Sequence, residues 1–181
     1  MIKKLKKLKK SKILVSIERK NIDDRTIHGF ILKYSTELVL IQYVYDFHLD
    51  GLMVLRIFDI TEIKSDKTDI FQTQLLKDER LYSKINFSKR YKIENWYSIL
   101  STIGRKYDLI IIEDENIKCC PIFIIGKLHK ITKESVFILG FSGVASWDDE
   151  LSEIYYEDIT SFQVDNNYAN VYKRFFKKIN K

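Results

Sequence analysis

The chain has little of the residues that build several familiar kinds of site. Its 181 residues include six glycines, one proline and two cysteines. The scarce glycines form no Gly-x-x-x-x-Gly-Lys phosphate loop, and a single proline excludes a proline-rich linker. Cys119 and Cys120 are adjacent, and adjacent cysteines bridge only with strained geometry. We therefore predict two reduced, half-buried strand cysteines and no disulfide framework.

Long hydrophobic runs are also absent. Even the apolar run at 109–112 ends at Glu113, far short of the ~20 residues that cross a membrane. Lysines interrupt the N-terminal apolar residues, unlike the apolar run of a secretory signal peptide. No serine lies in a nucleophile elbow, and His-Glu-x-x-His does not occur. We predict a soluble, cytoplasmic protein with no membrane insertion, enzymatic activity, cofactor, metal or small-molecule substrate.

Basic residues are concentrated at the N-terminus. The chain has 31 basic and 25 acidic residues, a net charge of +6, and its first twelve positions hold seven lysines. The other 24 basic residues nearly balance the acidic ones, so the excess charge belongs to this segment. Such a block attracts polyanions through counterion release, or it is a loosely ordered, solubilising terminus. The lysines are Lys3, Lys4, Lys6, Lys7, Lys9, Lys10 and Lys12.

Apolar residues recur among these lysines at spacings that a helix would gather on one side. This pattern is typical of helices that lie on membrane surfaces. An isolated helix of this length is marginal, so we do not expect it to anchor the chain to a membrane by itself. The apolar residues are Met1, Ile2, Leu5, Leu8 and Ile13.

The two halves of the chain contain similar short segments in the same order. Four segments of the first half recur in the second at offsets of 95, 97, 97 and 99 residues. The offset drifts only where loops would absorb insertions, which indicates an internal repeat of one small fold. The paired segments are 15–18 with 110–113, 29–31 with 126–128, 37–41 with 134–138, and 58–63 with 157–162.

Each half has the pattern of five short strands. Alternation and β-branched residues predict strands in the first half at 12–19, 25–34, 37–45, 51–57 and 61–64. Gly29 and Gly126 lie within the second strand of each half, where glycine usually marks a sharp bend or a bulge. Five short strands with such bends predict a small barrel in each half.

Helical spacing follows the strands of each half and also occurs between the halves. We therefore predict a mainly β protein (β with α): two tandem five-stranded barrels, each followed by a helix, joined by a packed helical bridge. The predicted parts are a basic arm at 1–11, a first barrel with its helix at 12–77, the bridge at 78–105, and a second barrel with its helix at 106–181. The residues predicted to share helix faces are Ile70, Phe71, Leu75 and Leu76, then Ile93, Trp96, Tyr97, Leu100 and Ile103, then Tyr168, Val171, Tyr172, Phe175 and Phe176.

Several segments of the second half resemble the sequence pattern of one protein family. These segments are 111–113, 125–127, 147–148, 157–160 and Tyr168. With the bent strand and the tight turn before the last strand, they resemble an uncharacterised bacterial family of tandem Sm-like, or SH3-like, small-barrel proteins. The resemblance implies an architecture, because that family has no established activity.

The nucleotide pocket of RNA-binding Sm proteins does not carry over to this sequence. That pocket uses an Asp and an Asn after the second strand and an Arg-Gly near the fourth. The corresponding loops, 34–37 and 131–134, have neither residue, and Ile57 follows Arg56 where the glycine would stand.

Asp-Ile-Thr occurs once in each half, before the last strand. We predict that Asp59 and Asp158 accept hydrogen bonds from backbone donors of a tight turn that also contains Thr61 and Thr160. The isoleucine between them would plug the barrel. This interpretation explains the repetition by structure and requires no chemistry.

Other candidate groups have ordinary structural interpretations. The histidines, His28, His48 and His129, are far apart in sequence and belong to no motif. The acids at 148–150 follow Trp147 on a loop, which predicts solvated carboxylates beside a packed aromatic ring. Aromatic and basic residues mingle at 84–97, as in single-stranded nucleic-acid sites, but their helical spacing favours core packing.

Two functions remain open. Small barrels keep exposed edge strands, so our first prediction is a binding or assembly module that acts through protein–protein interaction or self-association at these edges. The alternative is RNA or polyanion binding through the lysines of the N-terminal arm. That alternative predicts binding that weakens steeply with salt.

Overall fold

A computed structural model describes residues 1–115 and 121–179, and it divides the chain into two compact units, Met1–Glu94 and Asn95–Lys181. The boundary falls inside the predicted bridge. Strands account for 37% of the structure and helices for 29%, so the mainly β prediction is confirmed. Cys119 and Cys120 lie outside the described residues, and the cysteine prediction stays a prediction.

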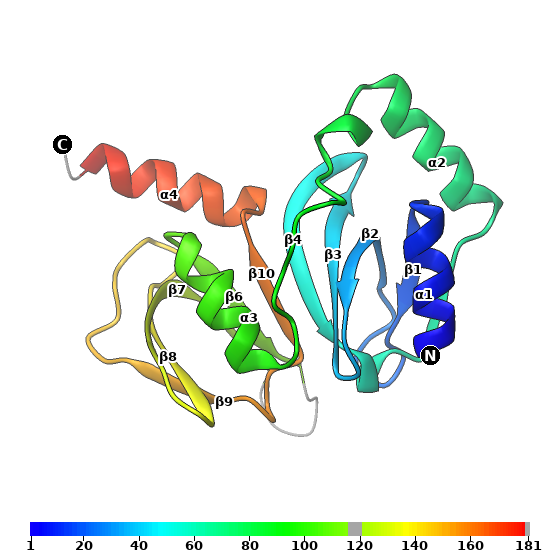
Figure 1. Cartoon of the computed structure of the whole chain (residues 1–181). Helices are drawn as coiled ribbons and strands as arrows, with labels where there is room; N and C mark the ends of the chain where they lie inside the picture. Colours follow the sequence, from blue (N-terminus) through cyan, green and yellow to red (C-terminus); the bar gives the residue numbers. More distant parts are fainter. Residues whose placement is uncertain (116–120, 180–181) are drawn as a thin grey trace. The chain divides into compact units, whose positions relative to one another are not determined.

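The first unit has five antiparallel strands in the order β5-β1-β2-β3-β4 (Figure 1). A helix precedes the strands and another follows them, and short 3₁₀ turns lie at Ile57–Asp59 and Tyr82–Lys84. Its elements are α1 (Ile2–Ser11), β1 (Val15–Glu18), β2 (Thr26–Tyr34), β3 (Leu38–Tyr45), β4 (His48–Arg56), β5 (Glu62–Lys64) and α2 (Lys67–Asp78).

The second unit repeats this order as β10-β6-β7-β8-β9. A helix again precedes the strands and another follows them, and a 3₁₀ turn lies at Gly104–Lys106. Its elements are α3 (Trp96–Thr102), β6 (Ile110–Asp114), β7 (Ile122–Ile131), β8 (Ser135–Gly140), β9 (Ser152–Tyr155), β10 (Ser161–Val164) and α4 (Asn167–Ile179).

The sheets are open, and the predicted small barrels are not confirmed. Among the described residues, β5 does not pair with β4, and β10 does not pair with β9. Closing a sheet requires tilted strands long enough to pair on both sides with a fixed stagger. The three residues of β5 are matched along their whole length with β1, from Ser16 opposite Lys64 to Glu18 opposite Glu62. A strand of three residues leaves few backbone hydrogen-bonding groups on its other edge for a second partner.

A glycine allows the close strand approach in each unit. Gly29 pairs with Tyr43, and a Cβ at Gly29 would lie 2.7 Å from the carbonyl oxygen of Gln42. Gly126 pairs with Gly140, and a Cβ there would lie 2.1 Å from the carbonyl oxygen of Leu139. A bulge follows each glycine, between residues 31 and 33 in β2 and between 128 and 130 in β7, as the glycine positions predict.

Each unit has a hydrophobic core of its own. In the first, α1 lies against β2 and contributes to a core formed mainly by strand residues (Figure 1). In the second, α4 supplies Ala169 and Phe176 to a cluster with Leu109, Ile111, Ile125 and Phe141. The core of the first unit includes Leu5, Val15, Ile17, Ile27, Ile31, Val39, Ile41, Met53, Leu55, Ile60 and Ile63.

The helix faces differ in part from the predicted ones. In α2 the packed side contains Leu76 together with Asp69 and Thr73, whereas Ile70 and Phe71 are more than half exposed. Hydrogen bonds fix this rotation, because the Leu14 N–H donates to Thr73 Oγ1 at 2.9 Å. The predicted bridge is helical only at α3 and in the short 3₁₀ turns, although its Ile93, Trp96, Leu100 and Ile103 are buried.

Candidate functional site

The lysine-rich N-terminal segment is an ordered helix that packs on the first unit. Leu5 is fully buried in the core of this unit, and Leu8 is partly buried against it. The helix ends at Ser11, whose hydroxyl donates to the Leu8 carbonyl at 2.7 Å, and Lys12 follows in the left-handed region with φ 52°. The interpretation of a loosely ordered terminus is therefore wrong, because burial of Leu5 holds the helix in place.

The exposed side of α1 carries only basic charge. Lys3, Lys6, Lys7 and Lys10 fall within about 100° of arc on a helix with 3.6 residues per turn, directly opposite Leu5 and Leu8. The helix contains no acidic residue. Packing of the two leucines therefore directs these four lysines into solvent, while Lys4 and Lys9 flank them.

A further lysine of β2 extends this charged surface. Burial and the nearby charge of Lys33 lower the pKa of Lys9 from its ordinary value. Lys33 is an exposed residue of β2, the strand that α1 contacts. Sequence reasoning missed Lys33, since only the packing of α1 on the sheet brings it to the helix. We refer to the seven N-terminal lysines and Lys33 as the lysine face.

The aromatic residues near the end of the first unit support its fold. Phe30 makes edge-to-face contacts with Tyr82 at 5.5 Å and with Phe87 at 6.0 Å between ring centroids. The Tyr82 hydroxyl donates to the Lys12 carbonyl at 3.0 Å, and Lys12 Nζ lies 5.2 Å from the centre of the Phe87 ring. Core packing, the favoured interpretation of the aromatic residues at 84–97, is thus confirmed for the buried Trp96, whereas Phe87 is half-buried and lies in a turn.

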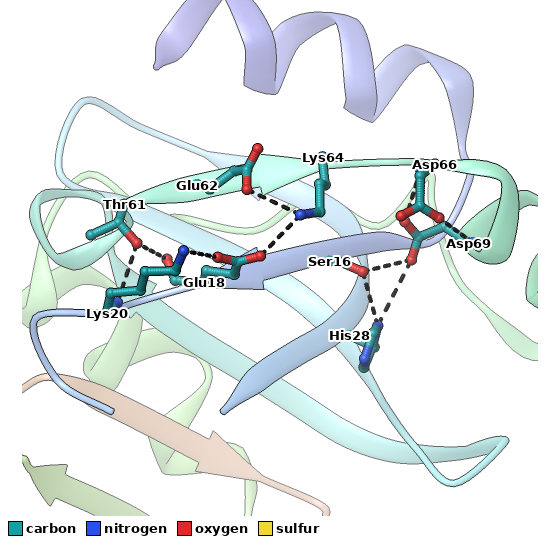
Figure 2. Close-up of polar contacts among 9 residues, drawn as sticks. All are labelled: Ser16, Glu18, Lys20, His28, Thr61, Glu62, Lys64, Asp66 and Asp69. Atoms are coloured by element: carbon teal, nitrogen blue, oxygen red, sulfur yellow. Dashed lines mark hydrogen bonds and ion pairs between the residues drawn. The ribbon is translucent and has the colours of Figure 1, made fainter. Parts of the chain in front are cut away.

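The Asp-Ile-Thr threonines make the same contacts in both units. Thr61 Oγ1 donates to the Glu18 carbonyl at 3.0 Å and accepts from the Lys20 N–H at 3.2 Å (Figure 2). Thr160 Oγ1 lies 2.9 Å from the Glu113 carbonyl oxygen and accepts from the Glu115 N–H at 3.1 Å. In each unit the threonine therefore joins the start of the last strand to the end of the first.

The aspartates of the motif differ from the prediction and from each other. Asp59 is 4% exposed, and its carboxylate binds the Arg56 guanidinium through Nε–Oδ2 and Nη2–Oδ1 distances of 2.6 and 3.1 Å. The Arg56 side chain therefore supplies the hydrogen bonds to Asp59 that were predicted to come from backbone N–H groups. Asp158 is half-buried, and its own N–H donates to the Tyr155 carbonyl at 3.1 Å. The buried isoleucines, Ile60 and Ile159, lie beneath these turns.

We expect Asp59→Ala to lower the free energy of unfolding of the first unit by about 2 kcal/mol, since a charge-assisted pair is removed from a buried site. Asp158→Ala should lower the free energy of unfolding of the second unit by less than about 1 kcal/mol. Hydrogen exchange followed by mass spectrometry measures the two units separately. Equal losses in the two variants would contradict the different roles assigned to these aspartates.

Ser16, His28 and Asp69 meet where α2 begins (Figure 2). The Ser16 hydroxyl donates to Asp69 Oδ1 at 2.8 Å and lies 3.2 Å from His28 Nδ1, which is itself 3.8 Å from the same carboxylate oxygen. In a hydrolytic triad the two imidazole nitrogens face the serine and the acid separately. Here one nitrogen faces both groups, and the serine proton already points at the carboxylate. The arrangement joins α2 to β1 and does not prepare a nucleophile.

Asp69 also caps α2. Its Oδ2 accepts from the Asp66 N–H at 2.9 Å, and Asp66 Oδ1 accepts from the N–H groups of Thr68 and Asp69 (Figure 2). This reciprocal capping box satisfies donors of the first helical turn. The buried carboxylate of Asp69 therefore has structural partners on both oxygens.

A charged cluster crosses from β1 to β5 in the same unit. Lys64 Nζ lies 3.0 Å from carboxylate oxygens of both Glu18 and Glu62, and Lys20 Nζ lies 3.1 Å from Glu18 (Figure 2). Hydrogen bonds from Lys64 and then Lys20 lower the pKa of Glu18, and those to Glu18 and Glu62 raise the pKa of Lys64. The cluster is balanced in charge, so it offers little attraction to an anion or a cation.

The other candidate groups are dispersed. His48 is exposed at the start of β4, where its Nδ1 lies 2.7 Å from the Asp46 carbonyl oxygen. Trp147 stacks on Phe176 with a centroid distance of 4.6 Å, as expected of a packed ring. Within residues 1–115 and 121–179, no three His, Cys, Asp or Glu side chains come together in a way that could hold a metal ion.

Comparisons with known proteins give no indication of function, so a function must be inferred from the geometry described above. No family model, no curated protein and no solved structure matches the chain. None of the helices in the described part of the chain is both long and apolar enough to cross a membrane.

Proposed function

We propose that the chain binds polyanions, with single-stranded RNA as the test case, through the lysine face, most of which lies on α1. The observation that supports this most directly is the rotation of α1: its leucines are fixed in the core of the first unit, so its lysines project outward with no acid among them. Lysines held in this way release condensed counterions when they meet phosphates, and this release dominates nucleic-acid affinity.

An ordered helix suits this function better than a flexible arm. A disordered segment loses conformational entropy when it binds, whereas a docked helix has already lost it during folding. The buried leucines also argue against the other use of such a sequence, as a helix on a membrane surface. Leu5 already packs in the core, so it is not available to a lipid layer.

The test replaces Lys3, Lys6, Lys7 and Lys10 with glutamine in the full chain. We expect at least tenfold weaker binding of labelled single-stranded RNA at low salt. The slope of log K against log salt should fall by up to about 3, at ~0.7 for each phosphate that the variant no longer neutralises. Fluorescence anisotropy over a range of salt concentrations measures both. Circular dichroism checks that α1 remains helical, because glutamine is nearly as good a helix former as lysine.

A matched control removes the same charge elsewhere. The variant with glutamine at Lys106, Lys130, Lys133 and Lys178 changes four exposed lysines of the second unit and leaves α1 intact. It should keep most of the affinity. Equal losses in the two variants would indicate attraction by net charge alone, and unchanged binding by the α1 variant would refute the proposal.

Protein assembly through sheet edges is the second candidate. It is supported by the open sheets, in which β5 and β9 are only three and four residues long and have one neighbour each among the described strands. Light scattering on the same samples distinguishes the candidates. A defined oligomer without RNA binding favours assembly, whereas a monomer that binds RNA favours the lysine face.

We also propose that the two units are tandem copies of one Sm-like fold. The equal strand orders, the matching threonine contacts and the close-approach glycines at 29 and 126 support this. A further pair of matching contacts is the Ile57 N–H to the Glu37 carbonyl at 2.7 Å and the Tyr156 N–H to the Glu134 carbonyl at 2.9 Å.

A further inference from the structure

The second unit contains a cavity of about 820 Å³ beside α4 and β7, elements labelled in Figure 1. Its walls come from three parts of this unit: residues 104–105 and 107–109, residues 127–129 of β7, and the second half of α4. The volume lies within the ~300–1,000 Å³ range of small-molecule sites. The cavity is therefore large enough for a ligand of nucleotide size.

Basic groups outnumber acidic ones around this cavity. Arg105, Lys127, His129, Lys173 and Lys177 line it, with Asp108 as the single carboxylate. Lys173 Nζ lies 2.8 Å from Asp108 Oδ2. A hydrogen bond from Lys173 lowers the pKa of Asp108, and the charges of Lys173, Lys177 and Lys127 lower it further. The lysines therefore create a positive electrostatic potential around Asp108, and this potential attracts negatively charged groups to the cavity.

Two of the cations remain available to a ligand. Among the described residues, Arg105 and Lys177 form no hydrogen bond or ion pair, whereas Lys173 is held by Asp108 and Lys127 lies over the Trp147 ring at 4.7 Å. An arginine fork can bind two phosphate oxygens at once, and a lysine supplies a mobile point charge. This pair is the combination expected for a doubly charged phosphate group.

The remaining walls are aromatic and aliphatic. Tyr107, Leu109, Leu128 and Phe176 line the same space. Phe176 is fixed by its stack on Trp147 and by an edge-to-face contact with Phe141 at 5.0 Å. Such surfaces pack against the flat, weakly polar part of a ligand and contribute affinity that charge alone does not. Inorganic phosphate would leave them uncovered.

We infer that this cavity binds a nucleoside phosphomonoester, with its phosphate between Arg105 and Lys177 and its base or sugar against Leu128 and Phe176. The site lies in the second unit and does not involve α1, so it is independent of the proposed polyanion binding. The same chemical group occurs in a free nucleotide and at the 5′ end of RNA.

Calorimetric titration of the full chain with adenosine monophosphate tests this inference. We expect saturable binding that is at least tenfold tighter than that of adenosine or inorganic phosphate. Arg105→Ala and Lys177→Ala should each weaken it about tenfold, while Lys106→Ala and Lys178→Ala, which remove neighbouring exposed lysines outside the cavity, should change it less than twofold. Asp108→Asn should tighten binding, because it removes an opposing charge from the cavity wall and releases Lys173.

Several results would overturn the inference. The inference is wrong if adenosine monophosphate does not bind, or if Asp108→Asn binds it more weakly than the unchanged chain. It is also wrong if the cavity variants and the variants of the neighbouring lysines lose equal affinity. Equal affinity for adenosine would remove the role of the phosphate, and equal affinity for inorganic phosphate would remove that of the nucleoside. The α1 variant with four glutamines should bind adenosine monophosphate like the unchanged chain, which separates this test from the RNA test.

A short oligonucleotide identifies the source of the group. Adenosine monophosphate that binds more tightly than a 5′-phosphorylated trinucleotide supports a free nucleotide as the ligand. A trinucleotide that binds more tightly with its 5′ phosphate than with a 5′ hydroxyl, and more tightly than adenosine monophosphate, assigns the cavity to an RNA end.

Discussion

Gly126→Ala should lower the free energy of unfolding of the second unit by about 3 kcal/mol, at the upper end of the usual cost of an overpacked methyl group. The added Cβ would lie 2.1 Å from the Leu139 carbonyl oxygen and 2.8 Å from the Gly140 Cα. Both atoms belong to the backbone of β8, so no side chain can rotate away to relieve the clash. Either the β7–β8 pairing separates locally or the strand shifts its register.

Urea titration followed by tryptophan fluorescence measures this effect selectively, because both tryptophans, Trp96 and Trp147, lie in the second unit. Gly143→Ala is the matched control. A Cβ at Gly143 would have no atom within 4 Å, so the same chemical change should cost less than about 0.5 kcal/mol. Similar midpoints for the two variants would contradict the close approach of β7 and β8.

Leu5→Ala should destabilise the first unit by about 3 kcal/mol, within the usual 2–5 kcal/mol for a buried leucine. The side chain is fully buried, and it packs with residues of β1, β2 and β5. The substitution leaves every lysine in the sequence. It therefore tests whether RNA affinity depends on where the lysines are held and not only on how many there are. If the docked helix is what presents the lysines, RNA affinity should fall together with stability.

Ile2→Ala is the control for this prediction, because Ile2 is exposed on the same helix. The substitution should lower the free energy of unfolding of the first unit by less than about 0.5 kcal/mol. Hydrogen exchange of peptides from residues 1–94 reports on the first unit, which contains no tryptophan. Unchanged protection of α1 in Leu5→Ala would show that the helix is held by something other than its leucines.

Local sequence signals predicted the strands well and the helix packing poorly. Alternating and continuous runs of apolar residues located β1 to β5 within a few positions, since β2, β3 and β4 are buried on both sides along much of their length. The Asp-Ile-Thr motif predicted a turn, but the partner of Asp59 is the arginine three residues earlier, whose guanidinium replaced the predicted backbone donors. The docking of α1 could not be predicted, because its partners, such as Ile60 and Ile63, lie more than fifty residues away.

The cavity of the second unit has no signal in the sequence. Arg105, Lys127 and Lys177 lie in a 3₁₀ turn, a strand and a helix that are separated by tens of residues. Each is one of 31 basic residues, and only the packing of α4 beside β7 makes them neighbours. The predicted small barrels were not confirmed for a related reason: strand number follows from local pattern, whereas the formation of a barrel depends on the stagger and length of strands far apart in the chain.

The threonine contacts have a consequence for the order of events during synthesis. Thr61 is bonded to the Glu18 carbonyl, 43 residues earlier, and β5 supplies the outer partner of β1. As the chain leaves the ribosome, the outer edge of β1 therefore stays unpaired until about residue 64 has emerged. Contacts between residues so far apart in sequence form late, because they require a large loss of chain entropy. During that interval the nascent chain exposes a strand edge that the finished protein covers.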